Sequence, residues 1–170
     1  MSVVLVGMPA AGKTTVGKLL AAKLGLPFVD LDERIEADTG VSVTEIFATA
    51  GEGAFRELEA QTAAVVLAGT PIVLSLGGGA VTNPKLREVI NAHSVVWLQV
   101  SLATALERVG DTRHRPLLAD NPAERLRVLL NERGVLYAQV AQVVVSTDAV
   151  KPSAVVERIV AALREGNHHG

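Results

Sequence analysis

The stretch Gly7-Met8-Pro9-Ala10-Ala11-Gly12-Lys13-Thr14 decides the fold, because it fits the pattern G-x-x-x-x-G-K-[ST] of phosphate-binding loops. An apolar, β-branched run at Val3–Val6 precedes it and predicts a buried strand. A helical pattern at Lys13–Leu24 follows it and ends at Gly25 and Pro27. Strand, glycine loop and helix in this order predict backbone N–H groups that wrap a phosphate at a helix N-terminus.

Two side chains of this loop have expected roles. Lys13 is predicted to reach the β- and γ-phosphates of a nucleoside triphosphate, and the Thr14 hydroxyl to bind Mg²⁺. The alternative is a chance glycine turn before a helix, which the flanking strand and helix make the weaker interpretation.

Beyond the loop, strand and helix patterns alternate along the chain. Strands are predicted at Val3–Val6, Pro27–Val29, Ile72–Leu76, Val95–Val100 and Val143–Ser146. Helices are predicted at Lys13–Leu24, Ser42–Ala48, Gly53–Leu67, Pro84–Asn91, Leu102–Val109, Pro122–Arg133 and Pro152–Arg164. Most of the strands are continuous apolar runs, which is typical of strands covered by helices on both faces. The pattern predicts a three-layer α/β fold with a parallel sheet, in a single domain over residues 1–170.

Composition excludes several classes of protein. The net charge of −2 and the lack of a long basic run argue against a nucleic-acid-binding surface. Aromatic residues make up only 3%, so a base-stacking platform is not expected. The chain has no Cys, which fits a reducing compartment, and no leader peptide or apolar run of the ~20 residues that a membrane span needs. We therefore expect a cytoplasmic protein without nucleic-acid or membrane partners, and a monomer, since no apolar stripe remains once helices cover the sheet.

Asp30 and Asp32 close the second predicted strand and, in an extended chain, would face the same side. The carboxyl ends of parallel strands face the ligand crevice of such sheets. One carboxylate there could hold Mg²⁺, and the other could take a proton from an attacking hydroxyl. The alternative is a helix N-cap in front of Glu33, and Asp32 could be both cap and catalyst.

Three glycines, Gly77–Gly79, follow the third predicted strand. They would let backbone N–H groups approach a ligand, or they could form only a tight turn from strand to helix. No Asp ends this strand, where many phosphate-loop enzymes carry a metal-binding acid, which leaves Asp30 as the better Mg²⁺ ligand.

Cationic side chains gather in a polar segment and on two helices. Thr112–Leu118 lies in a stretch long enough to form a lid, and a cation on a lid stabilises a transferring phosphoryl group. A solvated loop is the alternative. Arg56 and Arg133 are suited to binding a carboxylate, although each could equally be a helix-surface charge paired with a glutamate.

Taken together, these residues resemble the shikimate kinases over nearly the whole chain, from about Val3 to Arg164. The motifs that carry the resemblance are Gly7–Thr14, Asp30-Leu31-Asp32, Ile46-Phe47, Gly51-Glu52, Phe55–Glu59, Leu74–Val81 and Arg115–Leu118. The resemblance implies a phosphate-loop kinase fold with a five-stranded parallel sheet in the order 2-3-1-4-5. It also implies transfer of the γ-phosphoryl group of MgATP to the 3-hydroxyl of shikimate, a small-molecule substrate, in aromatic amino-acid biosynthesis. It further implies a substrate-binding helical region at about residues 31–60 and a lid at about residues 110–122.

The resemblance implies roles for individual residues. The nucleotide is expected at Gly7, Ala10, Ala11, Gly12, Lys13, Thr14, Thr15, Arg108, Arg115 and Pro152. Within this set, Arg108 and Pro152 would enclose the adenine, and Arg115 would close over ATP as a catalytic residue beside Lys13. Mg²⁺ is expected at Thr14 and Asp30.

The resemblance also implies a substrate site. It is expected to comprise Asp32, Phe47, Phe55, Arg56, Glu59, Gly77, Gly78, Gly79, Pro116, Leu117 and Arg133. Asp32 would bind the hydroxyls and act as the base, and Arg56 and Arg133 would bind the carboxylate. The chain departs from the family pattern at two places. Val135 stands where Pro is usual, and the segment Thr147–Pro152 has Lys151 but lacks the arginine that is often found there.

Three alternatives stay open on sequence alone. Another small-molecule kinase of the superfamily, of the gluconate or nucleoside-monophosphate type, is disfavoured by the combination of Asp32, Arg56 and Gly77–Gly79. A GTPase-like switch is disfavoured because no N-K-x-D motif is present. An inactive paralogue is disfavoured because Lys13, Thr14, Asp32 and Arg115 are all present.

Overall fold

A computed structural model of the chain describes residues 1–109 and 121–167. In this part of the chain, one sheet has the strand order β2-β3-β1-β4-β5, and all its paired strands are parallel. The strands are β1 (Val3–Val6), β2 (Phe28–Asp30), β3 (Val73–Ser75), β4 (Ser94–Gln99) and β5 (Val143–Ser146). The predicted α/β class, parallel sheet and strand order are confirmed.

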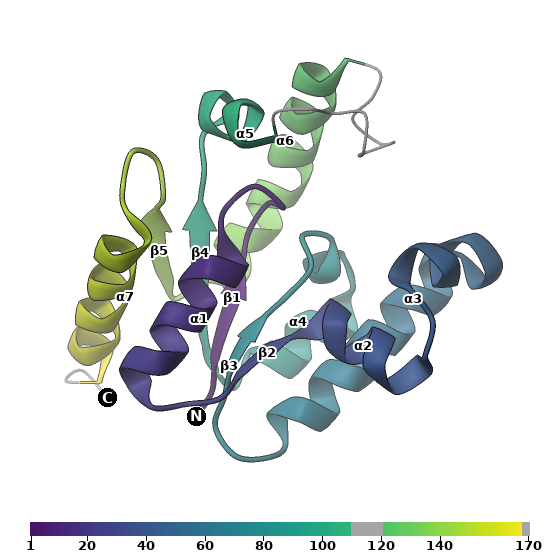
Figure 1. Ribbon diagram of the computed structural model, residues 1–170, viewed down its shortest axis with the longest axis horizontal. Helices are drawn as coiled ribbons and strands as arrows, with labels where there is room; N and C mark the ends of the chain where they lie inside the picture. Colours follow the sequence, from purple (N-terminus) through teal and green to yellow (C-terminus); the bar gives the residue numbers. More distant parts are fainter. Residues whose placement is uncertain (110–120, 168–170) are drawn as a thin grey trace.

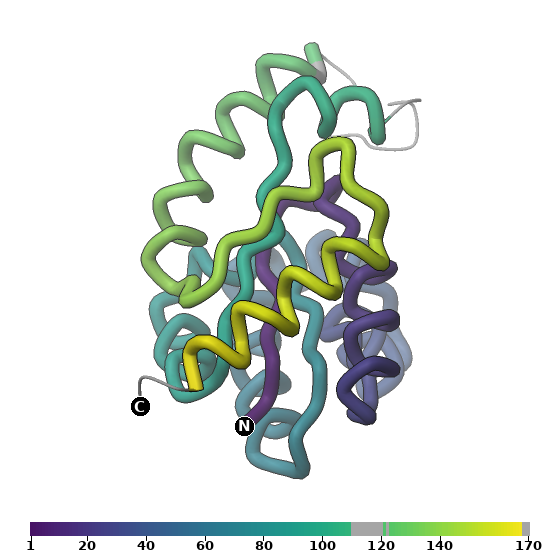
Figure 2. Tube along the Cα trace, turned by 90° about the vertical axis from the view of Figure 1, so that its left-hand side faces the viewer, coloured from purple at the N-terminus to yellow at the C-terminus, as the bar shows by residue number. Residues whose placement is uncertain are grey.

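Helices connect the strands and form the two outer layers. They are α1 (Lys13–Leu24), α2 (Leu31–Thr39), α3 (Val43–Leu67), the short 3₁₀ helix η1 (Ala80–Thr82), α4 (Pro84–Ile90), α5 (Leu102–Val109), α6 (Pro122–Val140) and α7 (Pro152–Gly166). Helices α1 and α7 lie side by side on one face of the sheet, and α4 and α6 lie on the other (Figures 1 and 2). Over residues 1–109 and 121–167, every helix is too short or too polar to cross a membrane.

The sheet is buried on both faces, as its unbroken apolar runs predict. Val4 and Leu5 of the central strand β1 are fully buried, and so are Leu74 in β3 and Val95 and Val96 in β4. Burying each of these side chains stabilises the fold by roughly 1.5–3 kcal/mol. The carboxyl ends of the five strands are therefore held in place by a fully packed core.

Two helices differ from the sequence-based expectation. α2 is absent from the helices that the apolar pattern predicts, although a helix N-cap in front of Glu33 was an open alternative. It begins because Asp30 caps it, with Oδ1 accepting from the backbone N–H of Glu33 at 3.1 Å. α6 continues past the predicted end at Arg133 to Val140, because the buried Tyr137 anchors its last turns and overrides Gly134.

Helix α3 joins two segments that the sequence predicts as separate helices. Gly51 lies between them with φ 86° and ψ 169°, outside the helical region, so the chain turns sharply there. Glycine tolerates this conformation, and the kink changes the direction of the helix just before Phe55 and Arg56.

Candidate active site

An open hollow of about 350 Å³ lies at the carboxyl ends of β1, β2 and β3. Its lining residues come from three separate segments of the sequence: Pro9, Gly12, Lys13, Thr14, Thr15, Asp30, Asp32, Ser75, Leu76, Gly77 and Gly78. The predicted phosphate loop, carboxylate pair and glycine segment therefore meet at one place, as expected for the ligand crevice of a parallel sheet.

The phosphate loop turns tightly between β1 and α1. Gly12 has φ 86°, a left-handed conformation that favours glycine, and α1 begins at the next residue. A Cβ on Gly7 would lie 2.6 Å from the carbonyl oxygen of Leu98 in β4, so only glycine fits there. These two glycines set the loop so that the N-terminus of α1 opens into the hollow.

Lys13 points back over its own loop. Its ammonium donates to the carbonyl oxygens of Gly7 at 2.7 Å and Met8 at 2.9 Å. Burial lowers the pKa of Lys13 to about 8, although the nearby carboxylates of Asp32 and Asp30 oppose that shift. Lys13 is therefore a partly desolvated cation between the phosphate loop and the carboxylates, where a phosphoryl group would be transferred.

The two aspartates lie in the hollow but not in one extended strand. Asp30 is the last residue of β2 and the N-cap of α2, whereas Asp32 lies in the first turn of that helix. The expectation that both would close the strand was therefore wrong, as was the suggestion that Asp32 is the cap. The cause is the bond from the Asp30 side chain to the backbone N–H of Glu33, which starts the helix immediately after Asp30.

Asp32 and Glu59 bring two carboxylates to the same glycine. A Cβ on Gly77 would lie 3.3 Å from both carboxylate oxygens of Asp32 and 3.5 Å from Glu59 Oε2. Among the described residues, the buried oxygens Asp32 Oδ1 and Glu59 Oε2 have no hydrogen-bond partner. Burial raises the pKa of Asp32, and Asp30 adds to this shift. Buried acceptors without partners indicate a place where a ligand's donors, such as hydroxyl groups, would bind.

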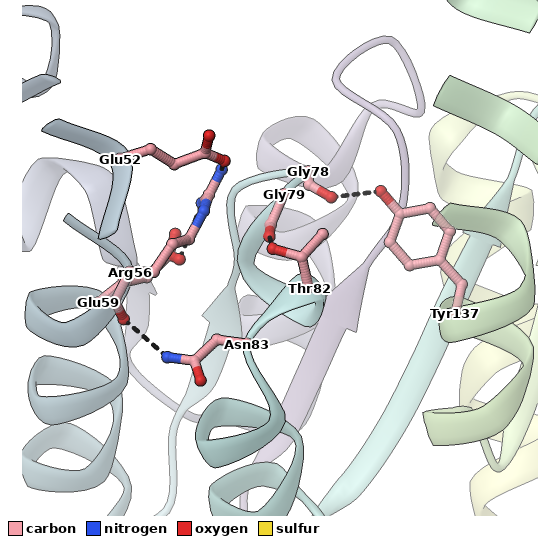
Figure 3. Close-up of polar contacts among 8 residues, drawn as sticks. All are labelled: Glu52, Arg56, Glu59, Gly78, Gly79, Thr82, Asn83 and Tyr137. Carbon is pink, nitrogen blue, oxygen red and sulfur yellow. Dashed lines mark hydrogen bonds and ion pairs between the residues drawn. The ribbon is translucent and has the colours of Figure 1, made fainter. Parts of the chain in front are cut away.

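Arg56 reaches toward the glycine segment from α3, as Figure 3 shows. It donates to Glu59 Oε1 at 2.9 Å, and Glu52 lies 3.5 Å away on its other side. The rings of Phe47 and Phe55 lie 5.7 Å and 5.3 Å from its guanidinium carbon. The arginine does pair with glutamates, but it is turned inward and only 15% exposed, unlike an ordinary surface charge.

Arg133 approaches the same segment from α6 on the opposite side. Its guanidinium nitrogens lie 3.2 Å from the positions that a Cβ would take on Gly78 and Gly79. A Cβ on Gly79 would also collide with the guanidinium of Arg56. The missing side chains at these glycines therefore provide the space in which two arginines converge, which is the arrangement expected for binding a carboxylate.

Arg108 joins the phosphate loop to the segment after β5. It donates to the carbonyl oxygen of Ala10 at 3.0 Å, and to the hydroxyl and carbonyl oxygens of Thr147 at 3.0 Å and 2.7 Å. Pro152 begins α7 after the same segment. The structure thus places Arg108 beside the phosphate loop, and adenine binding by Arg108 and Pro152 stays a prediction.

Some predicted site residues lie outside the described part of the chain. They are Arg115, Pro116 and Leu117, together with most of the predicted lid.

Sequence reasoning missed four residues that shape this site. Ser75 lines the hollow, and its register opposite Asp30 could have been inferred from its place at the end of a buried strand. Tyr137 donates to the carbonyl oxygen of Gly78, and Asn83 donates to that of Arg56 at 3.0 Å (Figure 3). Glu52, which was quoted only as part of a motif, contacts Arg56. The partners of Tyr137 and Asn83 lie far away in sequence, so no local signal could have revealed them.

The donor set fits a nucleoside triphosphate with Mg²⁺. Thr14 and Asp30 line the same hollow as Lys13 and the N-terminus of α1. Within the described residues, no group of three or more acidic, His or Cys side chains could hold a metal ion. A hydroxyl and one carboxylate suit Mg²⁺, which keeps several waters and is shared with substrate phosphates.

Comparisons with known proteins agree with this geometry. The family model described as shikimate kinase matches residues 9–164. A shikimate kinase from Mycobacterium avium is 46% identical over 161 residues, which cover 94% of this chain and 92% of the relative. A solved structure of a shikimate kinase from Acinetobacter baumannii in complex with shikimate has a TM-score of 0.91 and 35% identity, with 97% of this chain and 93% of that one covered.

A more distant likeness is informative about the fold alone. A gluconokinase from Sinorhizobium meliloti has a TM-score of 0.58 at 22% identity, with 96% of this chain and 91% of that one covered. Since the family model spans most of the chain and close relatives match almost its full length, the chain belongs to the shikimate kinase family.

Proposed function

We propose that this protein transfers the γ-phosphoryl group of MgATP to the 3-hydroxyl of shikimate, giving shikimate 3-phosphate and ADP. The observation that carries the proposal is the cluster of charged side chains around the glycine segment Gly77–Gly79, at the edge of the hollow. The half-buried carboxylate of Asp32 and the buried one of Glu59 meet two arginines, Arg56 and Arg133, at a segment without side chains. A small ring with several hydroxyls and one carboxylate matches this combination of acceptors and cations.

Asp32 is the proposed base and hydroxyl ligand. It lies in the hollow beside Lys13, and its unpartnered Oδ1 is free to accept a hydrogen bond from a substrate hydroxyl. Burial raises the pKa of its carboxyl, which makes Asp32 a stronger proton acceptor than a solvated aspartate. The cations of Arg56 and Lys13 oppose this rise in the pKa and keep the charged form accessible.

The carboxylate of the substrate is proposed to lie between Arg56 and Arg133. Glu59 and Glu52 hold the guanidinium of Arg56 from two sides, so its direction is fixed before a ligand binds. The rings of Phe47 and Phe55 pack against the same guanidinium and exclude water from it. Pro116 and Leu117 are proposed to complete the substrate site.

The nucleotide is proposed to bind across the phosphate loop, from Gly7 to Thr15, with its adenine near Arg108 and Pro152. Lys13 would bind the β- and γ-phosphates, and Thr14 and Asp30 would hold Mg²⁺. The ion, when bound, neutralises charge on the transferring group. Arg115 is proposed to close over the phosphates and, with the rest of the lid, to exclude water.

We further propose a single kinase domain over residues 1–170, with a substrate region at about residues 31–60 and a lid at about residues 110–122. A monomer is supported by the scatter of exposed large apolar side chains of the described residues, such as Leu19, Val65 and Val144, over separate elements. The lack of Cys supports a cytoplasmic location.

A coupled ADP-release assay tests the reaction. Purified protein is given MgATP together with shikimate, gluconate, AMP or no acceptor. We expect ADP release with shikimate alone, far above the rate without acceptor. Equal rates with and without shikimate would contradict the proposal, and turnover with gluconate or AMP would assign the site to another acceptor.

A further inference from the structure

Tyr137 links helix α6 to the glycine segment Gly77–Gly79. Its side chain is fully buried, and its hydroxyl donates to the carbonyl oxygen of Gly78 at 2.5 Å (Figure 3). The same hydroxyl lies 3.9 Å from the sulfur of Met8 in the phosphate loop. Trp97 of β4 packs against the tyrosine, with the ring centroids 5.7 Å apart. Tyr137 therefore touches the phosphate loop, the glycine segment and the sheet at once.

Arg133 lies one turn before Tyr137 on the same helix. Residues four apart on a helix share a face, so both side chains project toward Gly78 and Gly79. The guanidinium nitrogens of Arg133 lie 3.2 Å from the Cβ positions of these glycines. One face of α6 thus carries both the cation of Arg133, which is proposed to bind the ligand, and the hydroxyl of Tyr137, which donates to the glycine segment.

The glycine segment is also fixed from the other side. Thr82 donates to the carbonyl oxygen of Gly79 at 2.7 Å, and Asn83 donates to the carbonyl oxygen of Arg56 at 3.0 Å (Figure 3). The glycines have no side chains that could hold the segment in place. Its position between α3 and α6 therefore depends on hydrogen bonds from its neighbours.

We propose that Tyr137 is a positioning residue for the carboxylate site, because its hydroxyl fixes the Gly78 carbonyl relative to the turn of α6 that carries Arg133. The inference rests on the proposed function, in which Arg133 binds the substrate carboxylate. Gly134 follows the arginine directly, and glycine leaves this turn less rigid than any other residue would. The bond to Gly78 supplies the missing rigidity one turn later.

The chemistry of the tyrosine suits this role. Burial raises the pKa of Tyr137 to about 12, with Arg133 opposing the shift. The hydroxyl therefore keeps its proton and remains a donor at neutral pH. Loss of the hydroxyl would leave the Gly78 carbonyl without this donor and would let the arginine and the segment move apart.

The test compares Tyr137→Phe with the unchanged protein and with Trp97→Phe as a matched control. Trp97→Phe alters the packing around the tyrosine but keeps its hydroxyl. For Tyr137→Phe we expect the KM for shikimate to rise about three- to tenfold, the effect of losing one ordinary hydrogen bond. The kcat and the KM for ATP should stay within about twofold, because chemistry and nucleotide contacts remain. Trp97→Phe should leave the KM for shikimate unchanged.

A double-mutant cycle separates positioning from general weakening of the fold. If Tyr137 acts through Arg133, adding Tyr137→Phe to Arg133→Ala should change the KM for shikimate by less than about twofold. Calorimetric titration with shikimate should show the same changes in Kd without turnover. Tyr137→Met also lacks the hydroxyl and should show the same rise in the KM for shikimate. This value can be measured even if less of the variant folds, because KM does not depend on the folded fraction.

Two results would overturn the inference. One is an unchanged KM for shikimate in Tyr137→Phe while the unchanged protein turns over shikimate. The other is a rise in the KM for shikimate that Tyr137→Phe causes to the same factor in the Arg133→Ala variant as in the unchanged protein. Failure of the unchanged protein to use shikimate would instead reject the proposed function, and the inference with it.

Discussion

Arg56 and Glu59 lie one turn apart on α3, and the arginine donates to a glutamate whose side chain is completely buried. Burial raises the pKa of Glu59 to about 7, and Asp32 adds to the shift, while Arg56 and Arg133 oppose it. The cation proposed to bind the substrate carboxylate is therefore held by a carboxyl group that titrates near neutral pH.

The first prediction concerns stability and pH. Between about pH 4.5 and about 7, the folded chain keeps a proton on Glu59 that the unfolded chain has lost. Stability should therefore fall as the pH rises through this window, by about 3 kcal/mol from this group. Glu59→Gln should flatten this part of the curve. Melting temperatures measured from pH 5 to 8 check the prediction.

Glu57→Gln is the matched control for that experiment. Glu57 lies on the same helix but is about half exposed, and it pairs with Lys85 at 2.9 Å. Its removal should leave the pH dependence of the melting temperature as in the unchanged protein. Identical slopes in the two glutamine variants would show that Glu59 titrates as an ordinary glutamate.

The second prediction concerns the proposed base. Asp32→Asn should lower kcat by about 10²- to 10⁴-fold, because proton acceptance by a positioned carboxylate is worth that much. Binding of MgATP should remain, since the phosphate loop is intact. Asp38→Asn, on the same helix but exposed and paired with Arg34, should keep normal kcat. Steady-state kinetics check both, and near-normal turnover by Asp32→Asn would remove Asp32 as the base.

The third prediction concerns the carboxylate site. Arg133→Ala should raise the KM for shikimate about ten- to a hundredfold, since a hydrogen bond to a charged group is worth about 1.5–3 kcal/mol. The kcat should change less. Arg127→Ala removes an arginine from the same helix that is exposed and paired with Glu124, and should leave KM unchanged. Equal KM values in the two variants would place the substrate carboxylate elsewhere.

The fourth prediction compares two glycines. Gly79 has φ −93° and ψ −2°, which any residue adopts, but a Cβ there would collide with Arg56. Gly79→Ala should therefore fold but raise the KM for shikimate about tenfold, by displacing one charge-assisted bond. Gly134→Ala in α6 meets nothing within 4 Å. It should stabilise the fold by about 0.5–1 kcal/mol and leave KM unchanged, as thermal unfolding and kinetics will show.

The sheet and the phosphate loop could be predicted because their signals are local. Val3–Val6, Gly12 and Lys13 carry the strand, turn and helix start within a few residues, and β1 and α1 have the predicted bounds. The apolar pattern did not give the bounds of α2, because its nine residues contain few apolar side chains and follow the strand directly. Its start depends on one side-chain bond, from Asp30 to the backbone of Glu33.

The contacts within the site were less predictable, because they join distant segments. Arg56 and Arg133 could be named as candidates, but their convergence on Gly79 depends on the packing of α3 and α6 around the glycine segment. The hydrogen bond from Tyr137 to Gly78 spans 59 positions in the sequence. Only the folded structure brings such pairs together, so no local sequence motif could have predicted these contacts.

The backbone carbonyl groups of the phosphate loop compete with a bound phosphate for the ammonium of Lys13. Its ammonium already has two acceptors, the carbonyl oxygens of Gly7 and Met8. The third N–H of the ammonium remains for a phosphate, and a phosphate that draws the side chain further from the loop must offset the loss of these two bonds. A lone phosphate or sulfate ion makes few other contacts with which to offset that exchange, whereas a triphosphate also meets the N-terminus of α1 along its length. We therefore expect a small free anion to gain less from Lys13 than a nucleoside triphosphate does.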